Sequence, residues 1–384
     1  MKRNISVLTQ CANCGGCYNV CPVHAIRVNT EELFYRPAVK EDLCVNCGKC
    51  LQVCPMMKEL PQTEVRQAFW GWHRDRNVVK ASSSGGAFAA LAEGFLENSG
   101  VVFAACFDEQ KQVRIRSTDS LPLKEFQKSK YVESLVGNSF WEAREQLLAG
   151  RNVLFCGAPC QIAGLKQFLG KDYTNLYTCD FSCGGFSSHK IYREYLQLLE
   201  NTYGAPVKNV DFRPKCYGWS THGIKVCFAN GKEYTNTGIL DPYFYSFLYL
   251  PVNKREYCYQ CKFTKRHASD IILADFWRYK QLIGGKTPET GVSLILVCTE
   301  KGQQLVQQLH RNMTLEEISP EEASYNLCDR NRDEAIMGKR EQYLRCCEAH
   351  GVRTAAEKFG MPISWRAAWI RCKHTVKGVL LRFL

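Results

Sequence analysis

Short apolar runs bounded by turn-forming residues recur along most of the chain, and each run predicts a buried strand. They fall at residues 67–73, 101–107, 152–155, 175–178, 210–212, 223–228, 271–274 and 291–299. Apolar residues at helical spacing follow several of these runs, at 87–96, 162–169 and 302–310. Because a strand, a helix and a second strand succeed one another over 152–178, we expect a βαβ unit with ligand sites at the carboxyl ends of its strands.

The two ends of the chain have different patterns. Short strands are predicted at 24–28 and 35–39, and the polar stretch 55–65 is typical of a linker. After the α/β core, residues 333–358 favour a helix with a break at Gly351. We therefore expect an α+β protein with an N-terminal domain (1–62), an α/β domain (63–320) and a helical C-terminal region (321–384).

The cysteines of the N-terminal domain repeat one motif. The pattern C-x2-C-x2-C-x3-C-P runs from Cys11 to Pro22 and again from Cys44 to Pro55. Bacterial two-cluster ferredoxins, which residues 5–57 resemble, use this spacing to bind two 4Fe-4S clusters, and the last cysteine of each loop binds the other cluster. The motif assigns one cluster to Cys11, Cys14, Cys17 and Cys54, and the second to Cys44, Cys47, Cys50 and Cys21. Zinc ribbons need no third close cysteine, and disulfides suit small secreted scaffolds.

The composition indicates the cellular compartment and the kinds of partner that suit the protein. The 384 residues include 22 cysteines, and thiolate cluster ligands require a reducing compartment, so we expect a cytoplasmic protein. The formal charge of +12 suits acidic redox partners, but no basic–aromatic motif accompanies it, and we expect no nucleic-acid binding. The apolar run before Cys11 covers only residues 5–8, too short for a secretory leader, and no run approaches the length of a membrane span.

A series of short motifs in the α/β domain carries a family resemblance. In chain order they are Ser83–Gly86, Lys130-Tyr131, Phe155–Lys166, Cys183–Gly185, Phe212–Lys215, Gly218-Trp219, Cys258–Cys261 and Ala274–Trp277. Together they resemble the beta-subunit family of coenzyme F-420 hydrogenases and dehydrogenases, over about residues 66–320. The resemblance implies an FAD-binding flavoprotein that passes electrons between Fe-S clusters and a two-electron acceptor, such as a deazaflavin coenzyme or a pigment.

The expected flavin site follows from this resemblance. A Ser/Gly turn that opens a helix presents backbone N–H groups to an anion, although these residues also simply cap helices. We expect a cofactor phosphate at Ser83, Ser84, Gly85 and Gly86, and the flavin ring near Lys130, Tyr131, Gly157, Ala158, Pro159 and Gln161. N–H groups or a cation beside the ring stabilise reduced flavin, but Lys130 equally fits a solvated surface charge.

The sequence departs from the family pattern at two positions. Cys156 stands where a small hydroxyl or apolar residue is usual, and Gly184 follows Cys183 where a histidine is frequent. The second departure weakens any role for a histidine at that position in proton transfer.

Four cysteines outside the ferredoxin-like segment fall within the family-like motifs. We expect a third 4Fe-4S cluster, between the ferredoxin-like clusters and the flavin, at Cys160, Cys183, Cys258 and Cys261. Basic residues such as Lys262 would offset its negative charge. Zinc in the same thiolates, or buried structural cysteines, remain alternatives because spacing alone does not select a metal.

The C-terminal tail predicts an amphipathic basic helix. Its apolar stripe comprises Trp365, Trp369, Val376, Leu380 and Phe383, and its basic side comprises Arg366, Lys373 and Lys377. Such a helix suits peripheral contact with a membrane surface, and it equally suits docking on the protein's own core or on a second subunit.

The leading hypothesis is an Fe-S flavoprotein oxidoreductase that exchanges single electrons with a ferredoxin-like or other redox protein and electron pairs with a small molecule or coenzyme. The alternative is a non-catalytic electron-transfer subunit of a larger redox complex. The identity of the substrate stays open.

Overall fold

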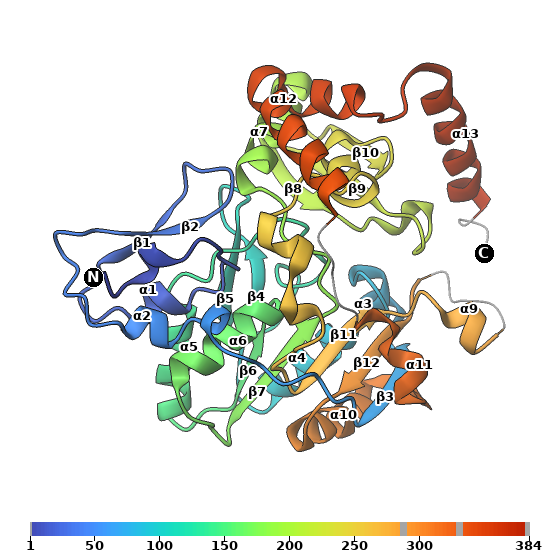
Figure 1. Cartoon of the computed structure of the whole chain (residues 1–384). Helices are drawn as coiled ribbons and strands as arrows, with labels where there is room; N and C mark the ends of the chain where they lie inside the picture. The colour runs from blue at the N-terminus through green and yellow to red at the C-terminus, as the bar shows by residue number, and fades with distance from the viewer. Residues whose placement is uncertain (1, 285–289, 328–332, 381–384) are drawn as a thin grey trace.

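The computed structural model describes residues 2–284, 290–327 and 333–380. Within these ranges the chain builds an N-terminal unit, a large mixed sheet flanked by helices, and a smaller sheet covered by two long helices (Figure 1). The helix α13 (Ser364–Leu380) projects beside the smaller sheet at the opposite side of the molecule from the N-terminal unit.

The N-terminal unit is small and held by few regular elements. These are α1 (Gly16–Val20), β1 (Ile26–Asn29), β2 (Arg36–Val39), α2 (Lys49–Gln52) and two single 3-10 turns, η1 (Ile5–Val7) and η2 (Pro55–Met57). β1 and β2 pair antiparallel, so the two strands expected at 24–28 and 35–39 are confirmed with shifts of one or two residues.

The large sheet has the order β13-β3-β12-β11-β7-β6-β4-β5 within the described ranges. Its strands are β3 (Gln67–His73), β4 (Val101–Phe107), β5 (Val113–Thr118), β6 (Val153–Cys156), β7 (Leu176–Phe181), β11 (Ile271–Asp275), β12 (Ser293–Val297) and β13 (Met313–Ile318). The central strands β4, β6, β7 and β11 are parallel, whereas β5, β12, β3 and β13 join antiparallel. The expected βαβ unit is confirmed, but the sheet is mixed rather than wholly parallel.

Helices cover both faces of this sheet, which is why its central strands are continuous apolar runs. α4 (Ala87–Glu97) and α10 (Glu300–Asn312) pack on one face, and α5 (Ser139–Leu148) and α6 (Pro159–Leu169) pack on the other. Shorter helices complete the unit: α3 (Arg76–Ala81), α9 (Tyr279–Leu282) and α11 (Pro320–Ala323). The edge strands β5 and β13 carry exposed charges such as Arg116 and Glu316 and were not predicted, because an edge strand keeps polar residues on its open face.

The smaller sheet contains β8 (Val207–Asp211), β9 (Gly223–Phe228) and β10 (Glu233–Thr237). It packs with α7 (His189–Tyr203), α8 (Pro242–Phe244) and α12 (Glu334–Lys358) around a buried aromatic core that includes Tyr192, Phe212 and Tyr243. Gly351 interrupts α12 with a positive φ of 79°, where the sequence predicts a break. Among the described residues, no helix is long and apolar enough to cross a lipid bilayer.

Candidate functional site

The two ferredoxin-type loops share one backbone conformation. Asn13 and Gly15 in the first loop have φ values of 56° and 86°, and Asn46 and Gly48 in the second have 51° and 77°. These left-handed residues curl each loop so that backbone N–H groups turn inward; that of Asn13 donates to the Sγ atom of Cys11 at 3.3 Å. N–H donors to cysteine sulfur tune an Fe-S cluster.

The loops surround two cavities with cysteines in the crossed sets. One cavity, the first cluster cavity, is lined by Cys11, Cys14, Cys17 and Cys54. The other, the second cluster cavity, is lined by Cys21, Cys44, Cys47 and Cys50. Each loop thus contributes its last cysteine to the cavity of the other loop, as the motif predicts.

The electrostatics of these thiols fit a positively charged occupant. Burial, and then the charges that Cys14, Cys11, Cys54 and Cys50 would carry, raise the pKa of Cys17 well above its usual range. Burial likewise raises the pKa of Cys14. Iron supplies the positive charge that stabilises such thiolates, so these residues fit the predicted clusters.

A third cavity, here called the third cysteine cavity, is lined by Cys160, Cys183, Cys258 and Cys261. Its thiols come from the first turn of α6, the loop after β7 and the turn η5 (Glu256–Gln260). The backbone N–H of Phe186 donates to Cys258 Sγ at 3.4 Å, and Gly185 allows this approach because a Cβ there would lie 3.1 Å from the Cβ of Cys258. The structure therefore brings together four cysteines that are up to about a hundred residues apart in the chain.

These sulfurs line cavities rather than converge on one point. Across the described residues, no three or more His, Cys, Asp or Glu side chains are grouped closely enough to hold a single metal ion. Ligation of a cluster at each of the three cavities stays a prediction.

A fourth and larger cavity, of about 340 Å³, opens at the carboxyl ends of the central strands. Most of the residues predicted to bind flavin line it: Ser83, Ser84, Gly86, Lys130, Tyr131, Gly157, Ala158 and Gln161. The remaining two lie elsewhere. Gly85 packs against the sheet, where a Cβ would meet Gly71 O at 2.4 Å, and Pro159 lines the third cysteine cavity.

Several of these polar side chains are already bonded within the protein. Ser83 Oγ accepts from Ser129 N at 2.7 Å, and Ser84 Oγ donates to Val292 O at 2.7 Å. Gln161 Oε1 accepts from Ala158 N at 3.0 Å and so fixes the turn before α6. The hydroxyl proton of Ser84 is consequently used within the protein, whereas Ser83 only accepts and keeps its own proton for an anion beside the backbone N–H groups at the start of α4.

Lys130 is half-buried, and its ammonium group bonds within the protein. Its Nζ atom donates to the carbonyls of Gln127 and Lys128 at 2.9 and 3.2 Å. Burial lowers the pKa of this ammonium group to about 8. Lys130 thus places a cation in the wall of the large cavity.

The structure also brings to the large cavity polar residues that lie within the family-like motifs but were not predicted to form the site. Asp275, at the end of β11, lines the large cavity and bonds Arg213 Nη1 at 3.0 Å and Trp219 Nε1 at 3.1 Å. Arg213 also donates to the hydroxyl of Tyr131 at 3.2 Å. The position of Asp275 at the end of a strand was the available sequence signal, but its partners are more than fifty residues away.

A second buried pair lies nearby. Asp180 lines the large cavity, and both of its carboxylate oxygens are 2.9 Å from Nδ1 of His267. Burial raises the pKa of Asp180, and the neighbouring His267 partly offsets that effect.

The first cluster cavity, the third cysteine cavity and the large cavity are neighbours in a row. Ala12 lines both the first cluster cavity and the third cysteine cavity, and its carbonyl accepts from Cys160 Sγ at 3.4 Å. Cys183, Gly185 and Phe186 line both the third cysteine cavity and the large cavity. The second cluster cavity lies at the surface, since Cys47 is exposed.

Comparison with known families decides the relationship. Residues 150–323 match the model of the C-terminal part of coenzyme F-420 hydrogenase/dehydrogenase beta subunits, and residues 10–57 match a 4Fe-4S dicluster domain. Residues 150–323 are therefore similar to the C-terminal part of these beta subunits. The N-terminal unit of the chain is thus an iron–sulfur electron-transfer domain, and the expected resemblance is confirmed.

One solved structure found in the comparison is the xenon-derivatised coenzyme F-420-reducing nickel–iron hydrogenase complex from Methanosarcina barkeri. It is 14% identical with a TM-score of 0.47, over 77% of this chain and 95% of that chain. A comparison with curated proteins gave no match.

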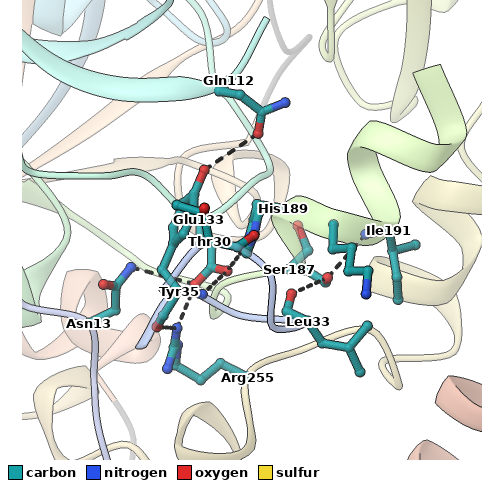
Figure 2. A network of polar contacts seen from close by, with 12 residues as sticks. Asn13, Thr30, Leu33, Tyr35, Gln112, Glu133, Ser187, His189, Ile191 and Arg255 are labelled. Carbon is teal, nitrogen blue, oxygen red and sulfur yellow. Dashed lines mark hydrogen bonds and ion pairs between the residues drawn. The ribbon is translucent and has the colours of Figure 1, made fainter. Parts of the chain in front are cut away.

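A buried polar network fixes the dicluster domain to the rest of the chain (Figure 2). Its centre is Glu133, whose carboxylate is fully buried. One oxygen accepts from Tyr35 N at 2.8 Å and lies 2.7 Å from His189 Nδ1; the other accepts from Arg255 at 2.7 Å. Asn13 and Tyr35 belong to the dicluster domain, so this network holds the cluster loops at a defined position against the α/β domain.

Proposed function

We propose that this protein is an iron–sulfur flavoprotein oxidoreductase, with a third 4Fe-4S cluster in the third cysteine cavity and FAD in the large cavity. The row formed by the first cluster cavity, the third cysteine cavity and the large cavity carries this proposal. Ala12 lines the first two of these cavities and Cys183 lines the last two, so neighbouring sites are separated by single shared residues. Such a row favours electron passage from the first cluster cavity to the large cavity.

The donor set of the third cysteine cavity fits a cluster. It offers four thiols and N–H donors to sulfur, and burial together with the charges of Cys261 and Cys183 raises the pKa of Cys160 well above its usual range. Lys262 lies beside it and donates to the carbonyl of Lys58. A cationic iron centre offsets the repulsion among these thiolates.

The large cavity fits a flavin nucleotide. Its volume lies in the range of cofactor pockets. The start of the eleven-residue helix α4 lines it at Gly86 and Ala87, and Lys130 adds a cation. These groups suit phosphate or the reduced, anionic form of the ring.

When bound, the clusters carry single electrons and FAD exchanges them for electron pairs. The chain itself contributes the surroundings. The turn held by Gln161 presents Gly157 to the large cavity, and the Arg213–Asp275 pair fixes Tyr131 beside it. A redox partner protein meets the dicluster domain at the exposed Cys47.

Anaerobic purification of the full chain with iron, sulfide and flavin analysis tests the proposal. Three cubane clusters predict about 12 Fe per chain, together with about one FAD. About 8 Fe per chain without flavin would contradict both the third cluster and FAD, and would leave only the two clusters of the dicluster domain. Oxidation of a reduced viologen dye by the isolated chain in the presence of a two-electron acceptor separates an enzyme from a purely electron-transferring subunit.

We also propose that α13 contacts an anionic membrane surface. Trp365 and Trp369 are 72% and 62% exposed one helical turn apart, and neither docks on the core. The underside of α13 packs on the turn η3 (Lys215–Tyr217), and the ring of His374 lies 5.9 Å from that of Tyr217. Val376, Leu380 and Lys377 of the predicted stripes have side chains outside the described set, and Phe383 lies outside the described residues.

A further inference from the structure

We propose that Cys156 and Cys179 form a redox-active dithiol pair in the wall of the large cavity. The pair switches between two thiols and a disulfide. Its chemistry as a dithiol depends only on the placement of the two residues, whereas its use as an electron-pair store beside FAD rests on the proposed function.

Strand register places the two thiols side by side. β6 and β7 are parallel neighbours, and Cys156 is the direct partner of Cys179. Both side chains belong to the buried cluster on the α4 and α10 face, so they point to the same side of the sheet. The neighbouring Cys156 thiol, together with burial, raises the pKa of Cys179 well above its usual range.

The backbone spacing suits a disulfide. Neighbouring strands lie about 4.8 Å apart. That separation falls within the Cα–Cα range of about 4.4–6.8 Å at which disulfides form. Closing the bond therefore requires side-chain rotation rather than movement of the strands.

The two thiols are reachable from the large cavity. Cys156 and Cys179 are 9% and 2% exposed, and both line that cavity. Each also precedes a cysteine of the third cysteine cavity by four residues, Cys160 and Cys183 respectively. The pair thus lies at the boundary between the proposed flavin site and the proposed third cluster.

The reaction is a two-electron oxidation. Both S–H bonds break and one S–S bond forms, which releases two protons and two electrons to a two-electron acceptor. Oxidised flavin is the acceptor class that the proposed function supplies, and an azo compound such as diamide takes the same electron pair and two protons to become a hydrazine. Reduction reverses each change.

The test uses the full-length protein as purified, with iron and flavin measured in every preparation. The protein is treated with diamide, quenched, unfolded with an alkylating reagent and digested with trypsin. We expect a disulfide that joins the peptides 152–166 and 172–190, 2 Da lighter than the unlinked pair. We also expect a reductive titration of the oxidised protein to take two more electrons per chain than that of the variant Cys179→Ser.

Matched variants separate the pair from other cysteines. The link is expected to disappear in both Cys156→Ser and Cys179→Ser, and to persist in Cys106→Ser, because Cys106 is equally buried but has Arg114 as its register partner. A link that survives in Cys156→Ser would instead join Cys160 and Cys183 and would overturn the proposal. Full alkylation of both Cys156 and Cys179 in the treated parent protein would also overturn it. If the link forms in chains without FAD, the dithiol stands and only the proposed flavin function fails.

Discussion

At the residue scale, the third cysteine cavity depends on cysteines that only folding brings together. Cys258 is buried, and its Sγ accepts the N–H of Phe186. A serine at this position keeps the volume but binds iron poorly. A single substitution at Cys258 therefore tests whether this cavity binds a cluster.

We predict that Cys258→Ser lowers iron and sulfide by about four each per chain, since a cubane holds four of each. Metal and sulfide analysis of anaerobically purified protein measures this. Cys298→Ser, a partly buried cysteine of none of the cavities, is the control and should keep the parental iron. Unchanged iron and sulfide in Cys258→Ser would exclude the third cluster, and loss of zinc alone would identify a zinc site.

The lowered pKa of Lys130 leads us to predict that the stability of the protein depends on pH. Burial lowers its pKa to about 8 in the folded protein, below its unfolded value. Between these two values the unfolded chain binds the additional proton, so stability rises with pH across this window. Below pH 8 both states are protonated and the full cost of burying the charge applies.

Replacing Lys130 by Met removes this cost while keeping most of the side chain. The stability advantage of Lys130→Met over the parent should be largest below pH 8 and fall by about 1.4 kcal/mol per pH unit between pH 8 and 10. Urea unfolding of the full chain at several pH values measures it. The exposed Lys124→Met should show a flat difference, and a flat difference for Lys130→Met would contradict the buried cation.

At the element scale, α1 of the dicluster domain packs against α6 of the α/β domain. The contact is close because Gly164 on α6 has no side chain. A Cβ there would lie 2.8 Å from Cys14 O and 3.2 Å from Cys14 Sγ. The helix α6 also carries Cys160, so one helix sets the separation between two cavities.

We predict that Gly164→Ala displaces Cys14, destabilises the protein by about 1–3 kcal/mol and weakens the cluster at the first cluster cavity. Thermal unfolding and the low-temperature electron paramagnetic resonance spectrum of the reduced protein measure these effects. In Gly338→Ala on α12 the new Cβ meets no atom within 4 Å, so this control should be neutral or slightly stabilised. Equal behaviour of the two variants would contradict the close approach.

The exposed tryptophans and basic residues of helix α13 lead us to predict lipid binding. Its two exposed tryptophans lie beside basic residues; Arg366 lies 5.5 Å from the ring of Trp365, and Lys373 lies 5.4 Å from that of Trp369. Its sequence has no acidic residue.

We expect the full-length protein to co-sediment with vesicles that contain anionic lipid. The double variant Trp365→Ala/Trp369→Ala should reduce the bound fraction about tenfold, because aromatic rings anchor such helices. Leu148→Ala, which removes an exposed apolar side chain elsewhere, should bind like the parent. Equal binding by all three proteins would remove α13 from the contact.

At the scale of the whole molecule, the buried network around Glu133 joins the dicluster domain to the α/β domain. Glu133 meets Arg255, His189 and the backbone of Tyr35, and the ring of His189 stacks on that of Tyr35 at 3.7 Å. The network reaches the first cluster loop through the carbonyl of Cys11 and the side chain of Asn13, and so fixes where that loop sits.

We predict that Glu133→Gln destabilises the protein by about 3–5 kcal/mol, because it leaves the buried Arg255 without its carboxylate. The dicluster domain should then detach more readily, seen as faster proteolysis within residues 58–66. Thermal unfolding and timed digestion measure both effects. The control Glu109→Gln alters an exposed pair with Arg116 and should change stability by less than about 1 kcal/mol. Parental stability in Glu133→Gln would show that the network does not hold the domains together.

The sequence by itself determined whatever depends on local spacing. The repeated cysteine motif predicted the dicluster domain because three ligands of each cluster lie within seven residues, which a single short loop holds around the cluster. Apolar runs predicted the central strands because strands covered on both faces need no polar alternation. The break at Gly351 followed from the conformational freedom of glycine.

Only the tertiary structure decided which distant residues meet. The edge strands β5 and β13, the bonds of Asp275 to Arg213 and Trp219, and the Glu133 network all join segments far apart in the chain, and no local pattern encodes their pairing. The partial burial of Lys130 could not be predicted either, because the sequence does not distinguish a lysine on the surface from one in a cavity wall. The pairing of Cys156 with Cys179 depends on the register of β6 and β7, which packing of the whole sheet fixes.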